Sequence, residues 1–364
     1  MQRRISQVML MGMLLLAAVC IPAAEARAGD YVEYMGTIHV GRPLGRVVAD
    51  PTRPKVYGIT GDGDVVFVDR TTMAVEKVSS TGRCLRDIDV DPAGDYLTVL
   101  DNITGEYWNQ PPSVYILTYD LETQSPSAIV MAQAPMYQMA LGRPNRFLGV
   151  GLNQWVSAYQ VDATTGARLS SCGAGYYGST EWGTQTFAAT SDGTRLFRTE
   201  LGISLIELKA FDTSTDTITA VASRGVGSYA AEPVFINSSD SSLYVGDIRV
   251  DPANIGVTLR MYPENIYAAT GDDKLAFGVG GVYDPVWGTP LEDMPVHFSM
   301  MTIGEGDRYL YAFDPGSQQL HVMYVVPEPA ALSLLALGGL VLLGRRRGCV
   351  PQNKQRRLAP ARFG

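Results

Sequence analysis

The sequence is poor in the residues that build metal and redox sites. Its 364 residues include four cysteines and three histidines, and none of them has the CxxC or Cys/His spacing of a zinc site. Cys20 and Cys349 lie near the ends of the chain, so only Cys84 and Cys172 belong to its central part. In an oxidising compartment these two would be able to form a disulfide. The sequence predicts no metal site and no cofactor.

Two kinds of metal site were weighed as alternatives, one built on imidazole and one on carboxylate. Three converging histidines would suit zinc, and a pair of carboxylates with backbone carbonyls would suit calcium. The residues are His39, His297 and His321, the pair Asp62 and Asp64, and the pair Asp89 and Asp91. Isolated strand histidines are usually surface groups, and both acidic pairs fall in turn-like segments, so we expect structural roles for all of them.

Positive charge is also scarce in the central part of the chain. The net charge is −8 and the pI is near 5.0, while basic residues cluster between Arg345 and Arg362. This distribution argues against nucleic acid as a partner. There is no P-loop, EF-hand or G-x-S-x-G motif, so no motif predicts an enzyme.

The N-terminus has the features of an export signal. Two arginines near the start are followed by an apolar run, Met9–Ala18, and by two A-x-A matches that end at Ala26 and Ala28. We therefore predict a helical secretory signal peptide over residues 1–28. The run is too short for a membrane span. A lipoprotein anchor on Cys20 is the alternative.

A polar turn followed by an apolar strand recurs seven times in the central part. The copies are ADPTRPKVYGI from Ala49, VDPAGDYLTVL from Val90, LGRPNRFLGV from Leu141, TSDGTRLFR from Thr190, NSSDSSLYVG from Asn237, TGDDKLAFGV from Thr270 and IGEGDRYLYAF from Ile303. Their first apolar residues are 40, 51, 49, 47, 32 and 34 residues apart. Intervals of about 40–50 residues are typical of four-stranded propeller blades. The two short intervals indicate either a trimmed blade or a misplaced turn.

The segments behind these turns read as β-hairpins. Five share an alternating apolar strand, an Asp with Thr, Ser or Gly behind it, and a second strand: VVFVDRTTMAVEKV, YILTYDLETQSPSAIV, VSAYQVDATTGARLSS, IELKAFDTSTDTITAV and YLYAFDPGSQQLHVMYV. Alternation of apolar and polar residues indicates half-buried strands. An Asp followed by Thr, Ser or Gly is typical of a turn, because its short side chain bonds the nearby backbone. Helical patterning is nearly absent, so residues 29–325 are predicted to be all-β.

These repeats resemble the YVTN-type and WD-type β-propeller repeats, most closely at Val90–Leu97, VDPAGDYL. The resemblance implies a propeller of seven blades over residues 29–325. A propeller has to close its ring to avoid exposed strand edges. Thr37–Gly41, TIHVG, is similar to the last strand of a YVTN unit but has no unit before it. We expect it to complete the last blade beside Leu320–Val325. A β-sandwich is the alternative fold.

The C-terminal region combines prolines, an apolar run and three arginines. Residues 330–344 would form a helix of about 22 Å at ~1.5 Å per residue, which is shorter than the ~30 Å hydrocarbon core. We predict a short transmembrane helix there, held by Arg345, Arg346 and Arg347 on the cytoplasmic side. Residues 349–364 would be a basic cytoplasmic tail.

Residues 326–348 resemble the PEP-CTERM sorting signal. The resemblance implies recognition by an exosortase, a membrane enzyme of Gram-negative bacteria that make exopolysaccharide, with Pro327, Glu328 and Pro329 as the recognition motif. It also implies passage through the inner membrane on the way to the cell surface or extracellular matrix. An ordinary C-terminal membrane anchor is the alternative.

Aromatic residues in loop-like segments are the candidate binding residues. Three segments carry them, namely 104–113, GAGYYGSTEWG, and 282–298, which we place between the sixth and seventh repeats. The residues are Tyr107, Trp108, Tyr176, Tyr177, Trp182, Tyr283 and Trp287. Loops on a rigid scaffold commonly carry binding sites, and flat aromatic rings bind sugars or protein partners.

Together these features predict an exported surface protein whose propeller binds a surface glycan or another protein. A propeller enzyme, such as a lactonase-like hydrolase, is the alternative. A third reading is a structural matrix component without a specific ligand. A cluster of His, Asp, Glu or Asn at the propeller axis would favour the enzyme.

Overall fold

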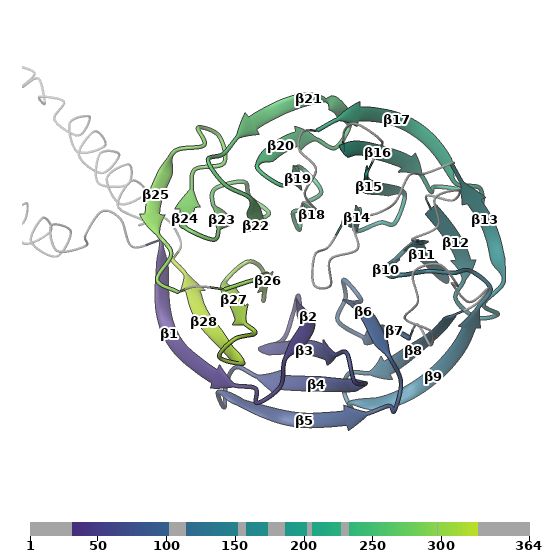
Figure 1. Cartoon of the computed structure of the whole chain (residues 1–364), viewed down its shortest axis with the longest axis horizontal. Coiled ribbons are helices and arrows are strands. Elements are labelled where there is room, and N and C mark those ends of the chain that lie inside the picture. Colours follow the sequence, from purple (N-terminus) through teal and green to yellow (C-terminus); the bar gives the residue numbers. More distant parts are fainter. Residues whose placement is uncertain are drawn as a thin grey trace, which may run out of the picture. The chain divides into compact units, whose positions relative to one another are not determined.

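The alternating apolar segments form strands, and the described part of the chain contains no helix. The computed structural model describes residues 31–326 apart from 102–113, 152–157, 174–185, 202–205, 227–232 and 297. Within these residues the chain forms 28 strands in seven four-stranded antiparallel sheets. Figure 1 shows the sheets arranged as a ring around one axis. The predicted all-β fold and seven blades are therefore confirmed, and a β-sandwich is excluded.

The first four blades follow the chain from the inner to the outer strand. Blade 1 contains β2 (Leu44–Ala49), β3 (Lys55–Thr60), β4 (Asp64–Asp69) and β5 (Ala74–Ser80). Blade 2 contains β6 (Leu85–Val90), β7 (Tyr96–Asp101), β8 (Val114–Asp120) and β9 (Ser125–Ala132). Blade 3 contains β10 (Gln138–Leu141), β11 (Arg146–Val150), β12 (Ala158–Asp162) and β13 (Arg168–Cys172). Blade 4 contains β14 (Phe187–Ala189), β15 (Arg195–Leu201), β16 (Ile206–Asp212) and β17 (Thr219–Gly225).

The last three blades complete the ring. Blade 5 contains β18 (Val234–Ile236), β19 (Leu243–Val245), β20 (Ile248–Asp251) and β21 (Asn254–Met261). Blade 6 contains β22 (Ile266–Ala269), β23 (Ala276–Gly278), β24 (Gly281–Tyr283) and β25 (Pro290–Asp293). Blade 7 contains β26 (Met300–Gly304), β27 (Tyr309–Asp314), β28 (Gln319–Val325) and, from the N-terminus, β1 (Val32–His39).

Strand β1 closes the ring, as the sequence predicts. It pairs with β28 in antiparallel register, with Val32 opposite Val325 and Ile38 opposite Leu320. In Figure 1 the two strands lie side by side at the outer edge of blade 7. The hairpin between β27 and β28 therefore joins the second and third strands of its blade, whereas the other four predicted hairpins join the third and fourth.

All seven predicted turns join the first strand of a blade to its second strand. The short intervals belong to complete but short blades, and no turn was misplaced. In blades 5 and 6 only Gly246 with Asp247, and Val279 with Gly280, separate the second strand from the third. The segment that we placed between the sixth and seventh repeats is part of blade 6, where it forms β24 and β25.

The predicted Asp turns are present. Asp69 Oδ1 accepts a hydrogen bond from the Thr71 N–H at 2.6 Å, and Asp162 Oδ1 accepts one from the Thr165 N–H at 2.8 Å. The same arrangement ends strands at Asp120, Asp212 and Asp314. The short side chain thus satisfies backbone donors inside the turn.

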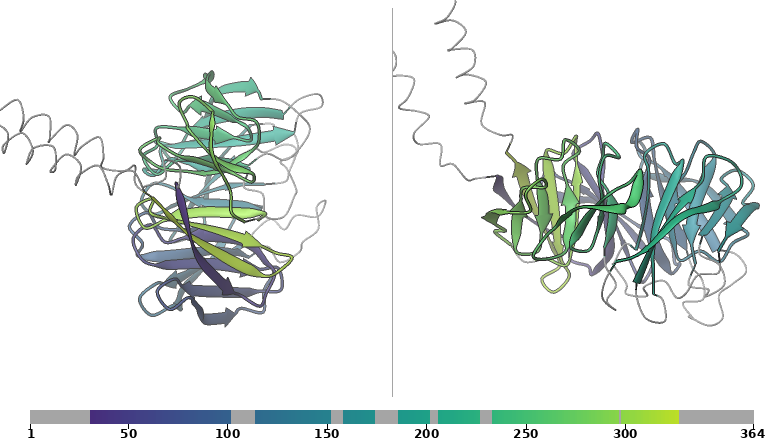
Figure 2. Two further views of the ribbon diagram at one scale, coloured as in Figure 1. Left: turned by 90° about the vertical axis from the view of Figure 1, so that its left-hand side faces the viewer. Right: turned by 90° about the horizontal axis from the view of Figure 1, so that it is seen from above.

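The hydrophobic core lies between neighbouring sheets. One cluster joins blade 7 to blade 1 through Ile38, Phe313 and Val322 against Val56 and Val66. Middle strands such as β4 are buried on both faces and read as continuous apolar runs. In the edge views of Figure 2, strands of the sheets nearest the viewer cross at an angle, which is the twist of these sheets. This packing leaves the inner strands to line the axis.

Candidate binding site on the propeller axis

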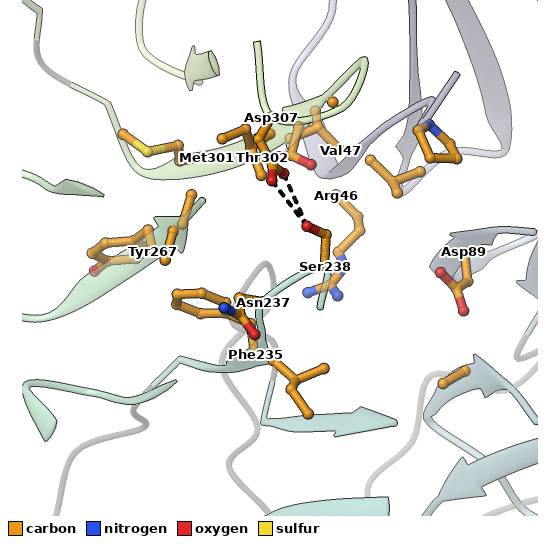
Figure 3. A pocket seen from close by; sticks show the side chains of 18 of the residues that line it. Arg46, Val47, Asp89, Phe235, Asn237, Ser238, Tyr267, Met301, Thr302 and Asp307 are labelled. Carbon is orange, nitrogen blue, oxygen red and sulfur yellow. Dashed lines mark hydrogen bonds between the residues drawn. The ribbon is translucent and has the colours of Figure 1, made fainter. Parts of the chain in front are cut away.

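A cavity of about 350 Å³ lies on the propeller axis. Its walls come from six of the seven inner strands, β2, β6, β10, β18, β22 and β26, at the ends that lead into the turns toward the second strands. Figure 3 shows polar side chains from several blades around this space. Because inner strands have one unpaired edge, their side chains and backbone groups meet at the axis.

Arg46 on β2 is the cationic residue of the cavity. Its side chain is 13% exposed, and its Nε lies 3.1 Å from Asp87 Oδ1. The guanidinium makes no hydrogen bond to any residue that the structure describes, and its Nε is buried. A guanidinium carries five donors, so this one has unused hydrogen-bonding capacity beside an open space.

Asp87 and Asp89 lie on alternate positions of β6 and face the neighbouring inner strand β10. Asp87 Oδ2 accepts the N–H of Met139 at 2.7 Å, and Asp89 Oδ2 accepts that of Leu141 at 2.8 Å. Their other oxygens accept the N–H groups of the residues that follow them. The two carboxyl groups therefore satisfy the unpaired edge of β10 and join blade 2 to blade 3.

Burial changes the acidity of both carboxyl groups. Desolvation raises the pKa of Asp89 to about 7, although Asp89 remains partly accessible from the cavity. Desolvation also raises the pKa of Asp87, while the positive charge of Arg46 acts in the opposite direction. Near neutral pH Asp89 is thus able to accept or donate a hydrogen bond.

Bulges set the direction of the inner strands near the cavity. Blades 1, 2 and 6 each carry an irregularity at the same place in the first strand pair, where Gly45, Arg86 and Tyr267 lack a partner. A bulge bends the strand and redirects nearby side chains. The bulges in blades 1 and 2 lie directly beside Arg46 and Asp87 and therefore affect the direction of these two side chains. In blade 6 the unpaired residue is Tyr267 itself, which lies in the cavity wall.

Two aromatic rings form an apolar wall. Phe235 on β18 and Tyr267 on β22 are half-buried and line the cavity. Phe235 stacks on Tyr244, with ring centroids 4.8 Å apart, and Tyr267 packs edge-on against Phe298 at 5.9 Å. Figure 3 places both rings on the side of the cavity away from Asp89. The packing behind each ring holds it in place.

Asp307 joins three turns at the edge of the cavity. Its Oδ2 accepts the Ser238 hydroxyl at 3.0 Å and the Gly271 N–H at 2.6 Å. These residues belong to blades 7, 5 and 6 respectively. Figure 3 shows the bonds between Ser238 and Asp307 as dashed lines. This contact fixes the edge of the cavity with polar groups.

Of the predicted aromatic residues, the two that the structure describes do not line this cavity. Tyr107, Trp108, Tyr176, Tyr177 and Trp182 lie outside the described residues. Tyr283, predicted to be in a loop, lies on β24 with only 5% of its surface exposed, and its hydroxyl donates to Glu264 Oε1 at 2.6 Å. Trp287 lies in the turn after β24 and is 67% exposed. Of the two described residues, only Trp287 has the surface position that was expected.

The cysteines and histidines are distributed over separate elements. Cys84 precedes β6 and Cys172 ends β13, and both are free thiols. His39 and His321 share blade 7, as expected, and His297 lies outside the described residues. No three His, Cys, Asp or Glu side chains in the described ranges are grouped as metal ligands would be. Asp64 instead pairs with Arg42, and Asp91 accepts the Ala93 N–H within its turn.

The predicted sorting signal also lies outside the described residues. This applies to Pro327, Glu328 and Pro329, to residues 330–344, and to Arg345, Arg346 and Arg347. It applies equally to residues 1–28 and 349–364. Within residues 31–326, as far as they are described, no helix has the length and apolar character needed to cross a membrane.

Sequence reasoning missed the cavity residues. It considered Asp89 only together with Asp91, as a calcium pair, and it did not select Arg46. The alternation of Asp87 and Asp89 in DIDV, directly before a blade turn, was the available signal, because such residues lie on an inner strand. The bulge beside Arg46 depends on the neighbouring strand and leaves no comparable pattern.

The fold and the cavity define a seven-bladed β-propeller with an axial, ligand-sized pocket. No family model and no curated protein matches the sequence. The β-propeller domain of Cps50 (Swd1) from Myceliophteria thermophila is similar in structure, with a TM-score of 0.62, 14% identity, and coverage of 81% of this chain and 100% of that one. Hydrazine synthase from Kuenenia stuttgartiensis has a TM-score of 0.58 and 12% identity, covering 78% and 95%. At these identities the likeness shows the fold alone.

Proposed function

We propose that the protein is exported to the surface of a Gram-negative cell and acts there as a binding module through its axial cavity. The export part is supported by the signal-like residues 1–28 and by the likeness of residues 326–348 to a PEP-CTERM signal. The binding part is supported by the fold, because a propeller is a rigid scaffold that presents one central pocket.

The observation that carries the binding proposal is the guanidinium of Arg46. The Nε of Arg46 is buried beside Asp87, 3.1 Å from its Oδ1. The two terminal nitrogens make no hydrogen bond to a described residue, and Arg46 lines the cavity. A ligand with oxygen acceptors would accept hydrogen bonds from these terminal nitrogens.

The binding test uses the full-length protein and isolated extracellular polysaccharide from an exosortase-containing bacterium. We expect the wild type to co-sediment with the polysaccharide and R46M to lose at least tenfold in apparent affinity. The matched control is R168M, because Arg168 is exposed on the outer strand β13. Equal co-sedimentation of wild type and R46M, or none by the wild type, would contradict the proposal.

The export test compares a host with and without its exosortase. In the host with the enzyme we expect the protein at the cell surface, with a C-terminus shortened near Pro327–Pro329. In the host without it, the protein should stay in the inner membrane with its C-terminus intact. Fractionation and mass spectrometry of the intact chain distinguish the two. The same mass and location in both hosts would rule out exosortase sorting.

A second candidate function, lactone hydrolysis, is favoured by one observation. A pKa of about 7 for Asp89 is that of an effective general base, and Arg46 would face the oxygen that gains negative charge. A lactone panel assayed with the full-length protein tests this reading. Turnover that D89N abolishes would support it, and turnover unchanged in D89N would reject it.

A further inference from the structure

We infer that the ligand of the axial cavity is a neutral pyranose ring, either a free sugar or the terminal unit of a glycan. The inference rests on the function proposed above, since it names the ligand of the same cavity. It is argued from three properties of the wall, namely its hydrogen-bonding groups, its charge and its aromatic surface.

The polar groups of the cavity need a ligand that both accepts and donates hydrogen bonds. Arg46 offers donors only. Asp89 already accepts one backbone N–H on each oxygen, and each oxygen keeps a further lone pair. Ser238 and Asp307 add a hydroxyl and a carboxylate at the edge. A ring with several hydroxyl groups meets both requirements, because each hydroxyl accepts and donates.

The charge around the cavity disfavours an anion. One guanidinium, that of Arg46, faces the carboxyl groups of Asp87 and Asp89, and Asp307 lies at the edge. The carboxylate of Asp307 offsets the charge of Arg46, so the site has no excess of positive charge to attract an anion. A buried cation would have to compete with Arg46. A neutral ligand avoids both costs.

The aromatic wall suits the carbon-bound hydrogens of a sugar ring. Phe235 and Tyr267 lie across the cavity from Asp89 in Figure 3, so a bound ring would have hydroxyls toward one side and a C–H face toward the other. Burial raises the pKa of the Tyr267 phenol, which is therefore uncharged at neutral pH. Stacked and edge-on packing behind the rings fixes them before the ligand arrives.

The cavity volume agrees with a small sugar. A volume of about 350 Å³ is near the lower end of the roughly 300–1,000 Å³ of ligand pockets. One or two rings would fill such a space, and a longer glycan would have to extend past Ser238 and Asp307. This is the reason to propose a terminal sugar unit.

The experiment measures sugar binding to the full-length protein by saturation-transfer NMR. The probes are the methyl β-glycosides of glucose, galactose and N-acetylglucosamine, with glucuronate as an anion and cyclohexylmethanol as an apolar ring. We expect transfer to at least one neutral glycoside, and a dissociation constant at least tenfold higher in R46M. R46K should also be weaker, because a lysine lacks the planar fork of donors.

Two further variants keep the test decisive. S238W places a large side chain at the exposed edge of the cavity and should abolish binding even if R46M fails to fold. R168M should bind like the wild type. Circular dichroism melting identifies any variant that is unfolded.

Each contrary result has a defined meaning. Preference for glucuronate would overturn the neutral ligand, and glycoside binding that survives R46M and S238W would overturn the location. Binding of cyclohexylmethanol alone would reduce the cavity to an apolar pocket. If no probe binds while the polysaccharide still co-sediments in an Arg46-dependent way, the sugar inference fails and the proposed binding function stands.

Discussion

Asp87 and Asp89 illustrate how single residues serve both the backbone and the cavity. Each carboxyl group bonds two backbone N–H groups, one within β6 and one on β10. The sequence interpretation grouped Asp89 with Asp91. The structure separates them, because β6 ends at Val90 and Asp91 belongs to the turn. Where a strand ends decides which neighbouring acids share a site, and this is difficult to read to within one residue.

The raised pKa of Asp89 predicts a specific pH dependence of stability. Its pKa rises from 3.8 to about 7 on folding, so the folded state retains a proton that the unfolded state releases near pH 4. The stabilising contribution of protonated Asp89 is therefore fully present below the pKa of the unfolded state. It is lost as pH rises through the pKa of the folded state. Urea unfolding should show that D89N gains stability relative to wild type between pH 4.5 and pH 7.5.

Asp62 provides the control for this prediction. A hydrogen bond from the Thr60 side chain lowers the pKa of Asp62, so its contribution is present above the unfolded value and is lost only as pH falls. D62N should therefore gain no stability relative to wild type over the same interval. If the stability of D89N relative to wild type is also independent of pH, then protonation of Asp89 is not coupled to folding.

Among the elements, turns were predictable and bulges were not. An Asp with Thr, Ser or Gly after it satisfies backbone N–H groups inside its own turn, so all five predicted hairpins were found. Asp284–Gly288 is such a turn as well, with Asp284 Oδ1 accepting the N–H groups of Val286 and Trp287. The sequence interpretation treated that segment as a loop and therefore misplaced Tyr283. The bulges of β2, β6 and β22 arise from pairing with other strands.

Gly63 in the turn between β3 and β4 should not tolerate a side chain. Its φ is +104°, and an added Cβ would lie 2.3 Å from the carbonyl oxygen of Arg83, which leads into blade 2. Gly82 also has a positive φ of +65°, but a Cβ there would meet nothing within 4 Å. G82A should cost about 1–2 kcal/mol, and G63A should cost clearly more, measured by urea denaturation. Equal losses of stability in G63A and G82A would show that the backbone at Arg83 moves aside to accommodate the added Cβ.

The closing strand β1 should contribute strongly to stability. Ile38 is 1% exposed and packs in the cluster between blades 7 and 1. I38A should lower the free energy of unfolding by about 2–5 kcal/mol. The neighbouring His39 is exposed, so H39A should change stability by less than about 0.5 kcal/mol. Thermal and urea unfolding of the two variants provide the comparison, and similar values would indicate a frayed β1.

At the scale of the whole molecule, the ring was predictable because the same turn recurs in every blade. The closure could also be predicted, since TIHVG reads as a last strand without a preceding unit. The function of the axis was harder to predict, because Arg46, Asp89, Phe235 and Tyr267 come from four different blades and meet only when the ring has closed. Two of the similar structures share only 12% and 14% of their residues with this chain, so very different sequences form this fold.

Ring closure predicts complementation between fragments. A chain that starts at Arg42 lacks the outer strand of blade 7 and should have a lower melting temperature. A synthetic peptide of residues 31–41 should raise that temperature in a concentration-dependent way, because it binds only the folded ring. A peptide of scrambled sequence should have no effect. No response to the native peptide would mean that β1 pairs with β28 only when it is covalently attached.

The position of β28 also has a mechanical consequence. This strand ends at Val325 and is hydrogen-bonded on one side to β27 and on the other to β1. A pulling force applied beyond Val325 and directed along the strand is resisted by two ladders in shear, whereas an outermost terminal strand would resist with one. A ring tethered through this end would therefore keep its shape under drag better than one tethered through β1.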